Sequence, residues 1–242
     1  MKISVCIPMY NEEAIAADCA RTLHDAMTAH SVMTGDSFEI IFCDDGSTDR
    51  CADCVREAAA QLSDITVVGY TDNRGKGSAV REAIAASTGD IVIYTDCDLA
   101  YGTDVIGKAV AQLKESGADV LIGSLNLTGD GYEGYTFIRK LASKTYIKVL
   151  NLFAGFRLSD SQCGFKAFRG DCARKIFPLV KTDGFAFDIE AIMIALKMKL
   201  SICEMGVKII NHRESKIHVA GDTFKMLADL RRIKKRVKAL DI

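Results

Sequence analysis

The sequence predicts an α/β protein in which helices flank a mostly parallel β-sheet. Short, unbroken runs of β-branched and aliphatic residues recur through the first half of the chain, as is typical of strands buried on both faces. Stretches with the apolar spacing of helices separate these runs. The chain has 242 residues, of which 49% are hydrophobic and 26% charged, so it has the composition of one globular core and not of a disordered or disulfide-rich protein.

The expected strands and helices alternate as far as about residue 124, which indicates βαβ winding. The strands are expected at 3–7, 38–43, 65–69, 91–95 and 120–123. The helices are expected at 13–30, 49–62, 78–87 and 104–116. Two of them begin with an aspartate, Asp49 and Asp104, which suits the positive end of a helix.

The second half of the chain adds further elements to this pattern. A glycine-rich loop at 128–134 precedes a long amphipathic segment at 135–153, and a short apolar run follows at 166–168. A helix is expected at 188–199, a strand at 201–210, a polar loop at 212–221 and a last helix at about 223–240. The sequence contains no internal repeat and no linker, so we expect a single domain.

Charge and hydropathy exclude several classes of protein. The net charge is −1, from 31 basic and 32 acidic residues, which argues against nucleic-acid binding. No apolar run approaches the roughly 18 to 20 residues that cross a bilayer, and residues 1–8 lack the apolar region of a signal peptide, so we expect a cytoplasmic protein.

The chain contains nine cysteines, and this odd number fits reduced thiols better than a set of disulfides. Cys51 and Cys54 fit packing in a helix, with a zinc or redox site as the alternative.

Acidic residues follow three of the expected strands. Glu12 comes after the first strand, Asp44 and Asp45 after the second, and Asp96 and Asp98 after the fourth. Ligands of open α/β sheets bind at the carboxyl ends of the strands, so we expect these carboxylates to meet at one edge. Carboxylates that repel one another favour a cation, and oxygen ligands favour Mg²⁺ or Mn²⁺. A D-x-D pair alone is typical of a solvated turn, but its place directly after a strand favours a metal site.

The glycine-rich stretch at 73–78 (NRGKGS) is similar to a phosphate-binding loop. It is not a Walker motif, because Tyr70 stands where that motif needs its first glycine and Gly77 where it needs serine or threonine. The dinucleotide fingerprint is also absent. Receiver-like and dehalogenase folds are disfavoured, because they carry an acidic residue at the end of strand one, where this chain has Pro8. Lys76 and its glycines therefore either contact a diphosphate or hold the turn.

Six blocks, taken in order, resemble family 2 glycosyltransferases, and most of all the dolichyl- and polyprenyl-phosphate sugar synthases. The resemblance runs from Lys2 to about Lys216, and its blocks are specific as a set: 7–13 (IPMYNEE), 44–49 (DDGSTD), 73–81 (N-x-GKGSAVR), 96–98 (DCD), 160–166 (D-x-QCGFK) and 184–190 (GFAFD-x-E). The resemblance implies a GT-A-like, Rossmann-related catalytic domain. Its parts are a nucleotide-binding half at 1–124, an acceptor-side half at 125–222 and a basic amphipathic helix at 223–242.

The resemblance also assigns site residues. Pro8, Tyr10, Glu12 and Asp44 match positions that hold the nucleotide base and ribose, and Asp96 and Asp98 match the D-x-D that bridges a divalent metal to the diphosphate. The further binding residues expected are Asn11, Asp45, Gly46, Asn73, Lys76 and Gly77. The residues expected in catalysis are Asp98, Asp160 as donor ligand or base, and Arg139 and Lys216 as cations that position an anionic acceptor. A solvated helix charge is the alternative for Arg139.

The family acts with inversion, so the resemblance implies transfer of a hexose to a polyprenyl or dolichyl phosphate at the cytoplasmic membrane face. Blocks 73–77 and 162–166 look more like the glucosyl relatives, which favours UDP-glucose, with GDP-mannose as the alternative donor. Ala100 stands where mannosyl relatives often carry glutamine. Leu125 replaces an arginine that many relatives use to contact phosphate, so a saccharide or cell-wall acceptor stays open. A non-catalytic nucleotide-binding role is a further alternative. His212 either contacts the metal or the diphosphate, or has a structural role in its loop.

Two segments have the composition of helices at a membrane surface. Residues 224–240 contain seven basic residues and one acidic residue, with apolar residues at helical spacing, and 135–153 is similar. Each helix could equally pack its apolar side on the core. We expect peripheral contact with an anionic membrane surface, which is compatible with a homo-oligomer or with a separate membrane-anchoring partner.

Overall fold

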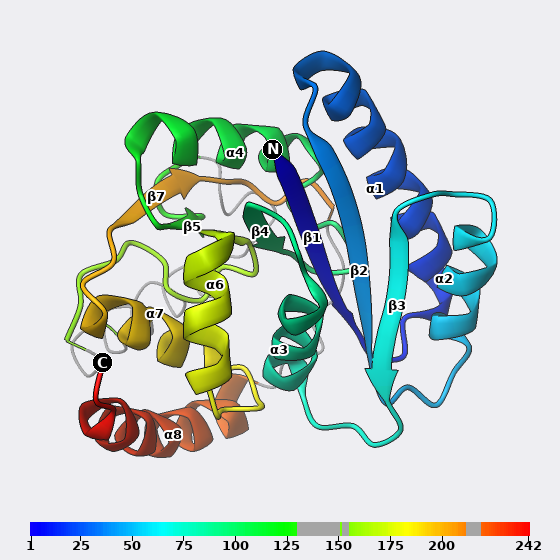
Figure 1. Cartoon of the computed structure of the whole chain (residues 1–242). Helices are drawn as coiled ribbons and strands as arrows, with labels where there is room; N and C mark the ends of the chain where they lie inside the picture. Colours follow the sequence, from blue (N-terminus) through cyan, green and yellow to red (C-terminus); the bar gives the residue numbers. More distant parts are fainter. Residues whose placement is uncertain (130–150, 152–154, 212–218) are drawn as a thin grey trace.

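The computed structural model describes residues 1–129, 151, 155–211 and 219–242, with the backbone alone for 219–228 (Figure 1). Within this part, a seven-stranded sheet has the order β3-β2-β1-β4-β6-β5-β7. β6 is antiparallel to its neighbours β4 and β5, and the other pairs are parallel, so the mostly parallel sheet is confirmed. The strands are β1 (Lys2–Met9), β2 (Ser37–Asp45), β3 (Ile65–Tyr70), β4 (Ile91–Tyr94), β5 (Val120–Ser124), β6 (Lys166–Arg169) and β7 (Ile202–Gly206).

Helices cover both faces of the sheet. Ile3, Val5 and Ile7 of β1 lie in a buried cluster with residues of α1, α2 and α4, whereas Cys6 points to a second cluster with α3, α6, α7 and α8. Burial on both faces explains why the strands are apolar at nearly every position. The helices are α1 (Glu13–Thr34), α2 (Cys51–Ala59), α3 (Lys76–Ala86), α4 (Asp104–Ser116), α6 (Gly170–Ile176), α7 (Phe187–Lys197) and α8 (Val219–Ala239), with a 3₁₀ turn at Phe177–Leu179.

The elements of the first half lie where the sequence predicts them, but some ends differ. α2 begins at Cys51 and not at residue 49, because Asp49 stays outside the helix and accepts a hydrogen bond from the backbone N–H of Cys51 (3.1 Å). β7 ends at Gly206 and not at 210, because its partner strand ends at Ser124, directly opposite Gly206.

The sequence pattern misses α6 and the place of β6. α6 has 7 residues and begins at a glycine, so its buried Cys172, Ala173 and Ile176 are too few to show a helical period. β6 lies between β4 and β5 although it follows both along the chain. Both halves of the chain therefore contribute to one sheet, and the functional division near residue 124 stays a prediction.

The last helix, α8, lies against α7 (Figure 1). Leu230, Ile233 and Val237 are buried in the same cluster as α7, so this part of the helix packs its apolar residues on the core. The basic side chains exposed between them are Arg231, Arg232, Lys234, Lys235 and Lys238. No helix in the described part of the chain is long and apolar enough to cross a membrane. Most of the predicted amphipathic segment at 135–153 lies outside the described residues.

Candidate active site

The loops that follow β1 and β2 are joined by hydrogen bonds. Asn11 Oδ1 accepts the backbone N–H of Thr48 (2.8 Å), and the Asn11 N–H donates to Ser47 Oγ (3.0 Å). Asp49 accepts the backbone N–H groups at the starts of α1 and α2, from Glu13 (2.9 Å) and Cys51 (3.1 Å). Burial raises the pKa of Asp49, but these hydrogen bonds outweigh burial and hold the pKa below its ordinary value. Asn11 and Asp49 therefore hold together the two loops that carry the expected nucleotide-binding residues.

Pro8, Tyr10 and Asp44 lie at the carboxyl ends of β1 and β2. Pro8 is within β1, and it interrupts no bond to β4, because the pairing of β1 with β4 ends at Cys6. Met9 is opposite Asp44, and Tyr10 follows with 42% of its surface exposed. An exposed aromatic ring and a half-buried carboxylate therefore lie near the ends of two neighbouring strands. Both kinds of group are suited to binding a nucleoside.

Asp45 has a different environment from Asp44. Its buried carboxylate accepts hydrogen bonds from Tyr70 Oη (2.6 Å), Asn73 Nδ2 (3.0 Å) and the backbone N–H groups of Arg74 (2.9 Å) and Gly75 (2.9 Å). Burial, with the hydrogen bond to Asp45, raises the pKa of Tyr70. The structure thus places Asp45 and Asn73 beneath the loop that leads into α3, where they hold its backbone.

Two glycines of the site allow backbone segments to approach closely. Gly46 has φ +67°, and a Cβ there would collide with the backbone of residues 71–73. Gly77 packs in the same way against the Thr182 carbonyl and Phe187. Both residues therefore shape the path of the chain on either side of Lys76.

Lys76 and the D-x-D pair form a charged cluster at the end of β4. Lys76 Nζ makes an ion pair with Asp96 Oδ1, and Asp98 Oδ1 accepts the backbone N–H of Ala100 (3.1 Å). Burial lowers the pKa of Lys76, but the carboxylates around it outweigh burial and raise the pKa. Burial raises the pKa of Asp98, and repulsion from Asp96 and Glu12 raises it further. The sequence predicted this convergence of acidic groups, but it gave no partner for Lys76.

The cluster fits a divalent cation whose ligands come partly from the protein and partly from a substrate. Asp96 and Glu12 both repel the charged form of Asp98, so positive charge beside Asp98 is favourable. Among residues 1–129, 151, 155–211 and 219–242, no group of three or more His, Cys, Asp or Glu side chains is arranged to hold a metal ion alone. Two carboxylates with diphosphate oxygens and water match the oxygen ligands that Mg²⁺ uses.

The turn at 162–166 closes one side of this cluster. Gly164 lies so close to the Asp96 carboxylate that a Cβ would collide with it, and the Gly164 N–H donates to Tyr101 Oη (3.0 Å). Lys166, fully buried in β6, donates to the Cys163 carbonyl (2.7 Å) and to Asp188 Oδ1 (2.7 Å).

The hydroxyl of Tyr94 also donates to Asp188. Sequence reasoning assigned no role to this buried group of Tyr94, Lys166 and Asp188. The available signal was a lysine at the start of a run that is otherwise apolar.

Asp160 lies between the segments that follow β5 and precede β6. It is buried and accepts the backbone N–H groups of Gln162 (3.1 Å) and Leu125 (3.3 Å). Burial raises its pKa, and these hydrogen bonds offset only part of the rise. Leu125 itself is buried in the core cluster. Arg139, Lys216 and His212 lie outside the described residues.

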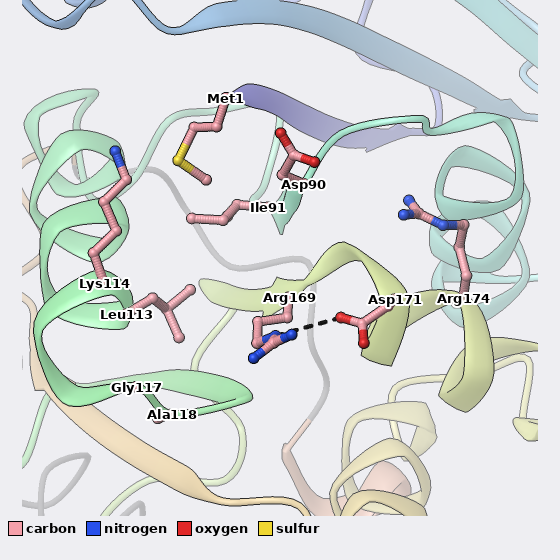
Figure 2. Close-up of a pocket in the computed structure, with 10 residues that line it drawn as sticks. All are labelled: Met1, Asp90, Ile91, Leu113, Lys114, Gly117, Ala118, Arg169, Asp171 and Arg174. Carbon is pink, nitrogen blue, oxygen red and sulfur yellow. Dashed lines mark hydrogen bonds and ion pairs between the residues drawn. The ribbon is translucent and has the colours of Figure 1, made fainter.

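A cavity of about 500 Å³ lies at the opposite edge of the sheet (Figure 2). It is lined by residues that precede β1, β4 and β5, including Met1, Asp90 and Ala118, and by Arg169 at the end of the antiparallel β6. None of the predicted site residues lines it. The Arg169 guanidinium is paired with Asp171 (3.4 Å), and we assign this cavity no role in the site.

All nine cysteines are free thiols in the described structure. Cys51 is buried at the start of α2 and donates to Ser47 Oγ (3.0 Å). Burial raises its pKa to about 11, so the thiol stays protonated and unreactive at neutral pH. For Cys51, these observations support the packing interpretation over a redox one.

The model of "Glycosyl transferase family 2" matches residues 4–177. The chain belongs to this family. The predicted site residues Pro8, Asp44, Lys76, Asp96 and Asp160 all lie within the matched residues, whereas α7 and α8 lie beyond them.

Curated relatives agree with the assignment, and a solved structure has a similar fold. A Saccharomyces cerevisiae protein named dolichyl-phosphate beta-glucosyltransferase is 29% identical over 94% of this chain and 72% of its own length. A Pyrococcus furiosus dolichol-phosphate mannosyltransferase is 33% identical over 62% of this chain and 40% of its own. A Mycobacterium tuberculosis glucosyl-3-phosphoglycerate synthase, solved with Mn²⁺ and UDP, superposes with a TM-score of 0.69 at 20% identity and covers 99% of this chain and 81% of that one. The structural likeness confirms the GT-A-like fold.

Proposed function

We propose that this family 2 glycosyltransferase moves glucose, with inversion, from UDP-glucose to a dolichyl or polyprenyl phosphate at the cytoplasmic face of a membrane. The observation that carries the proposal is the cluster of Lys76, Asp96 and Asp98 at the carboxyl ends of the strands. The relatives named as dolichyl-phosphate beta-glucosyltransferases support glucose and a lipid phosphate, because the Dictyostelium discoideum protein aligns over 97% of this chain and the Drosophila melanogaster protein over 86%.

The donor side of the site follows from the described residues. Tyr10 and Asp44 would contact the nucleoside, on loops that Asn11 and Asp45 hold in place. Asp96 and Asp98 would hold Mg²⁺ or Mn²⁺, which neutralises charge on the leaving diphosphate. Lys76, already charged beside Asp96, would place a second positive group next to the diphosphate.

The acceptor side needs little base catalysis if the acceptor is a phosphate. A phosphate oxygen is anionic at neutral pH and can attack the anomeric carbon directly. Arg139 and Lys216 would hold this phosphate. Asp160, whose raised pKa leaves it a better proton acceptor than an exposed aspartate, would orient the sugar or remove a proton from a neutral acceptor.

A transfer assay tests this function. Purified protein is incubated with Mn²⁺, vesicles that contain dolichyl phosphate and radiolabelled UDP-glucose, and the product is extracted into organic solvent. We expect labelled lipid from UDP-glucose and much less from GDP-mannose. Asp98→Asn should reduce the rate about a hundredfold or more, since it weakens the cation's hold on the leaving group. Asp104→Asn is the matched control, because Asp104 is exposed at the start of α4 and should leave the rate unchanged.

Three outcomes would contradict parts of the proposal. Label that stays in the aqueous phase as a larger saccharide would replace the lipid acceptor by a soluble one, which the buried Leu125 in place of an arginine would explain. Stable UDP- and GDP-sugars in every mixture, with no nucleotide binding by calorimetry, would reject the transferase function. Nucleotide binding without turnover would select the non-catalytic alternative.

We also propose that the protein contacts an anionic membrane surface. The exposed cations of α8 support this contact, while its buried apolar residues do not take part in it. The attraction would therefore be electrostatic, without insertion of the described part of α8 into the bilayer.

A further inference from the structure

Glu190 of α7 is a fully buried carboxylate with three hydrogen-bond donors around it. Its Oε1 accepts Arg236 Nε of α8 (2.6 Å). Its Oε2 accepts the backbone N–H groups of Lys181 (2.9 Å) and Thr182 (2.8 Å). A buried charge is costly unless it is paired and hydrogen-bonded, so Glu190 fixes both α8 and the loop at 181–183 relative to α7.

Arg236 reaches this loop directly as well. Its Nη2 donates to Thr182 Oγ1 (2.8 Å), so the guanidinium contacts the carboxylate and the loop at the same time. This geometry depends on the planar fork of donors in arginine, which a lysine ammonium cannot reproduce.

The loop at 181–183 in turn holds the beginning of α3. No side chain caps this helix, and its first turn is bound instead by the Asp183 carbonyl, which accepts the Gly77 N–H (2.7 Å). Arg81 of α3 donates to the Thr182 carbonyl (2.9 Å) and forms an ion pair with Asp183. The loop therefore takes the place of a helix cap.

Lys76 is the first residue of α3, and its Nζ forms an ion pair with Asp96 of the D-x-D pair. We propose that Arg236 is a positioning residue for Lys76, acting through Glu190 and the loop at 181–183. The inference rests on the proposed function, in which Lys76 acts beside the donor diphosphate. It gives α8 a role at the donor site in addition to its basic surface.

The test is a double-mutant cycle read by calorimetric titration of UDP in the presence of Mn²⁺, at a temperature well below the melting point of every variant. The variants are Arg236→Gln, Lys76→Met and the two combined. Lys235→Gln is the matched control. This substitution removes one positive charge from the same turn of α8, but the side chain of Lys235 is exposed. Thermal unfolding of each variant is measured in parallel.

We expect Arg236→Gln to weaken UDP binding about tenfold, which equals about 1.4 kcal/mol. Lys235→Gln should bind UDP as the wild type does. In the Lys76→Met background, Arg236→Gln should add no further loss, because the residue through which it acts is gone. Arg236→Lys should fall between the wild type and Arg236→Gln. Where Arg236→Gln does not fold, Arg236→Lys and Thr182→Val take its place in the cycle.

Three results separate the possible failures. A lower melting temperature with unchanged UDP affinity would reduce Arg236 to a structural residue and overturn the inference. The same tenfold loss in the Lys76→Met background would also overturn it, since the effect would not pass through Lys76. A wild-type protein that binds neither UDP nor GDP would instead reject the proposed function itself.

Discussion

Asp44 and Asp45 are consecutive residues with different surroundings. Asp44 is half-buried at the strand end, whereas the carboxylate of Asp45 is occupied by the loop at 70–75. The alternation of side chains along a strand separates them. Sequence reasoning grouped both as nucleotide ligands, because the contacts that distinguish them come from residues about 25 to 30 positions away.

The D-x-D pair was easier to predict than its environment. Its place after an apolar run fixes Asp96 and Asp98 at the ligand edge of a parallel sheet. The partner of Lys76 and the closeness of Gly164 to Asp96 depend on tertiary packing, which no local pattern records.

Gly46 offers a test at the scale of one residue. Gly46→Ala should lower the free energy of unfolding by about 3 kcal/mol, since it adds a backbone collision to the strain of a left-handed residue. Gly35→Ala is the control: Gly35 has φ +73° but open space around it, so we expect only about 1 kcal/mol. Urea denaturation measures both. Equal losses in the two variants would show that backbone strain alone, and not close approach, sets the requirement at Gly46.

At the scale of elements, the long periodic helices were predicted well, whereas the short α6 and the direction of β6 were not. The helices α1, α4 and α8 have apolar residues in several turns, so their existence follows from the sequence. The 7-residue α6 has no such repetition. The antiparallel direction of β6 also has no local signature, since a short apolar run fits either direction.

Asp49 joins two helices and predicts a pH dependence. Asp49→Ala should reduce stability at pH 7 by about 1 kcal/mol, because it removes the acceptor for the first N–H groups of α1 and α2. The pKa of Asp49 is lowered in the folded protein, so its contribution is complete above the unfolded pKa of about 4 and is lost as pH falls through the folded pKa.

Urea denaturation of wild type and Asp49→Ala between pH 7 and pH 2.5 measures this difference. The difference between the free energies of unfolding of the two proteins should become smaller below about pH 4. Asp53→Ala, in an exposed pair with Arg56 on α2, is the control and should show a smaller gap. A gap that stays constant with pH would mean that the charge of Asp49 does not contribute.

At the scale of the whole molecule, α8 faces two environments. One side is packed on α7 and reaches toward the site through Arg236, and the other presents cations to solvent. The proposed membrane attraction and the proposed positioning of Lys76 would therefore depend on different residues of one helix, so mutation can separate them.

Vesicle binding tests the outward side. The combined variant Arg231→Gln, Lys235→Gln and Lys238→Gln should bind vesicles rich in phosphatidylserine at least about tenfold more weakly, since each cation near such a surface contributes about 1 kcal/mol. Flotation or sedimentation measures the bound fraction, with neutral phosphatidylcholine vesicles and high salt as controls. UDP affinity should not change. Undiminished binding would assign the membrane contact to another part of the chain.

The position of β6 has a consequence for how the chain matures on the ribosome. β4 and β5 emerge early, but they pair with each other only through residues 166–169, which are synthesised later. Until then each strand presents an open edge of unsatisfied backbone groups. At that stage most of the predicted nucleotide-site residues have been synthesised while β4 and β5 are not yet joined, so we expect protection by chaperones to matter most then.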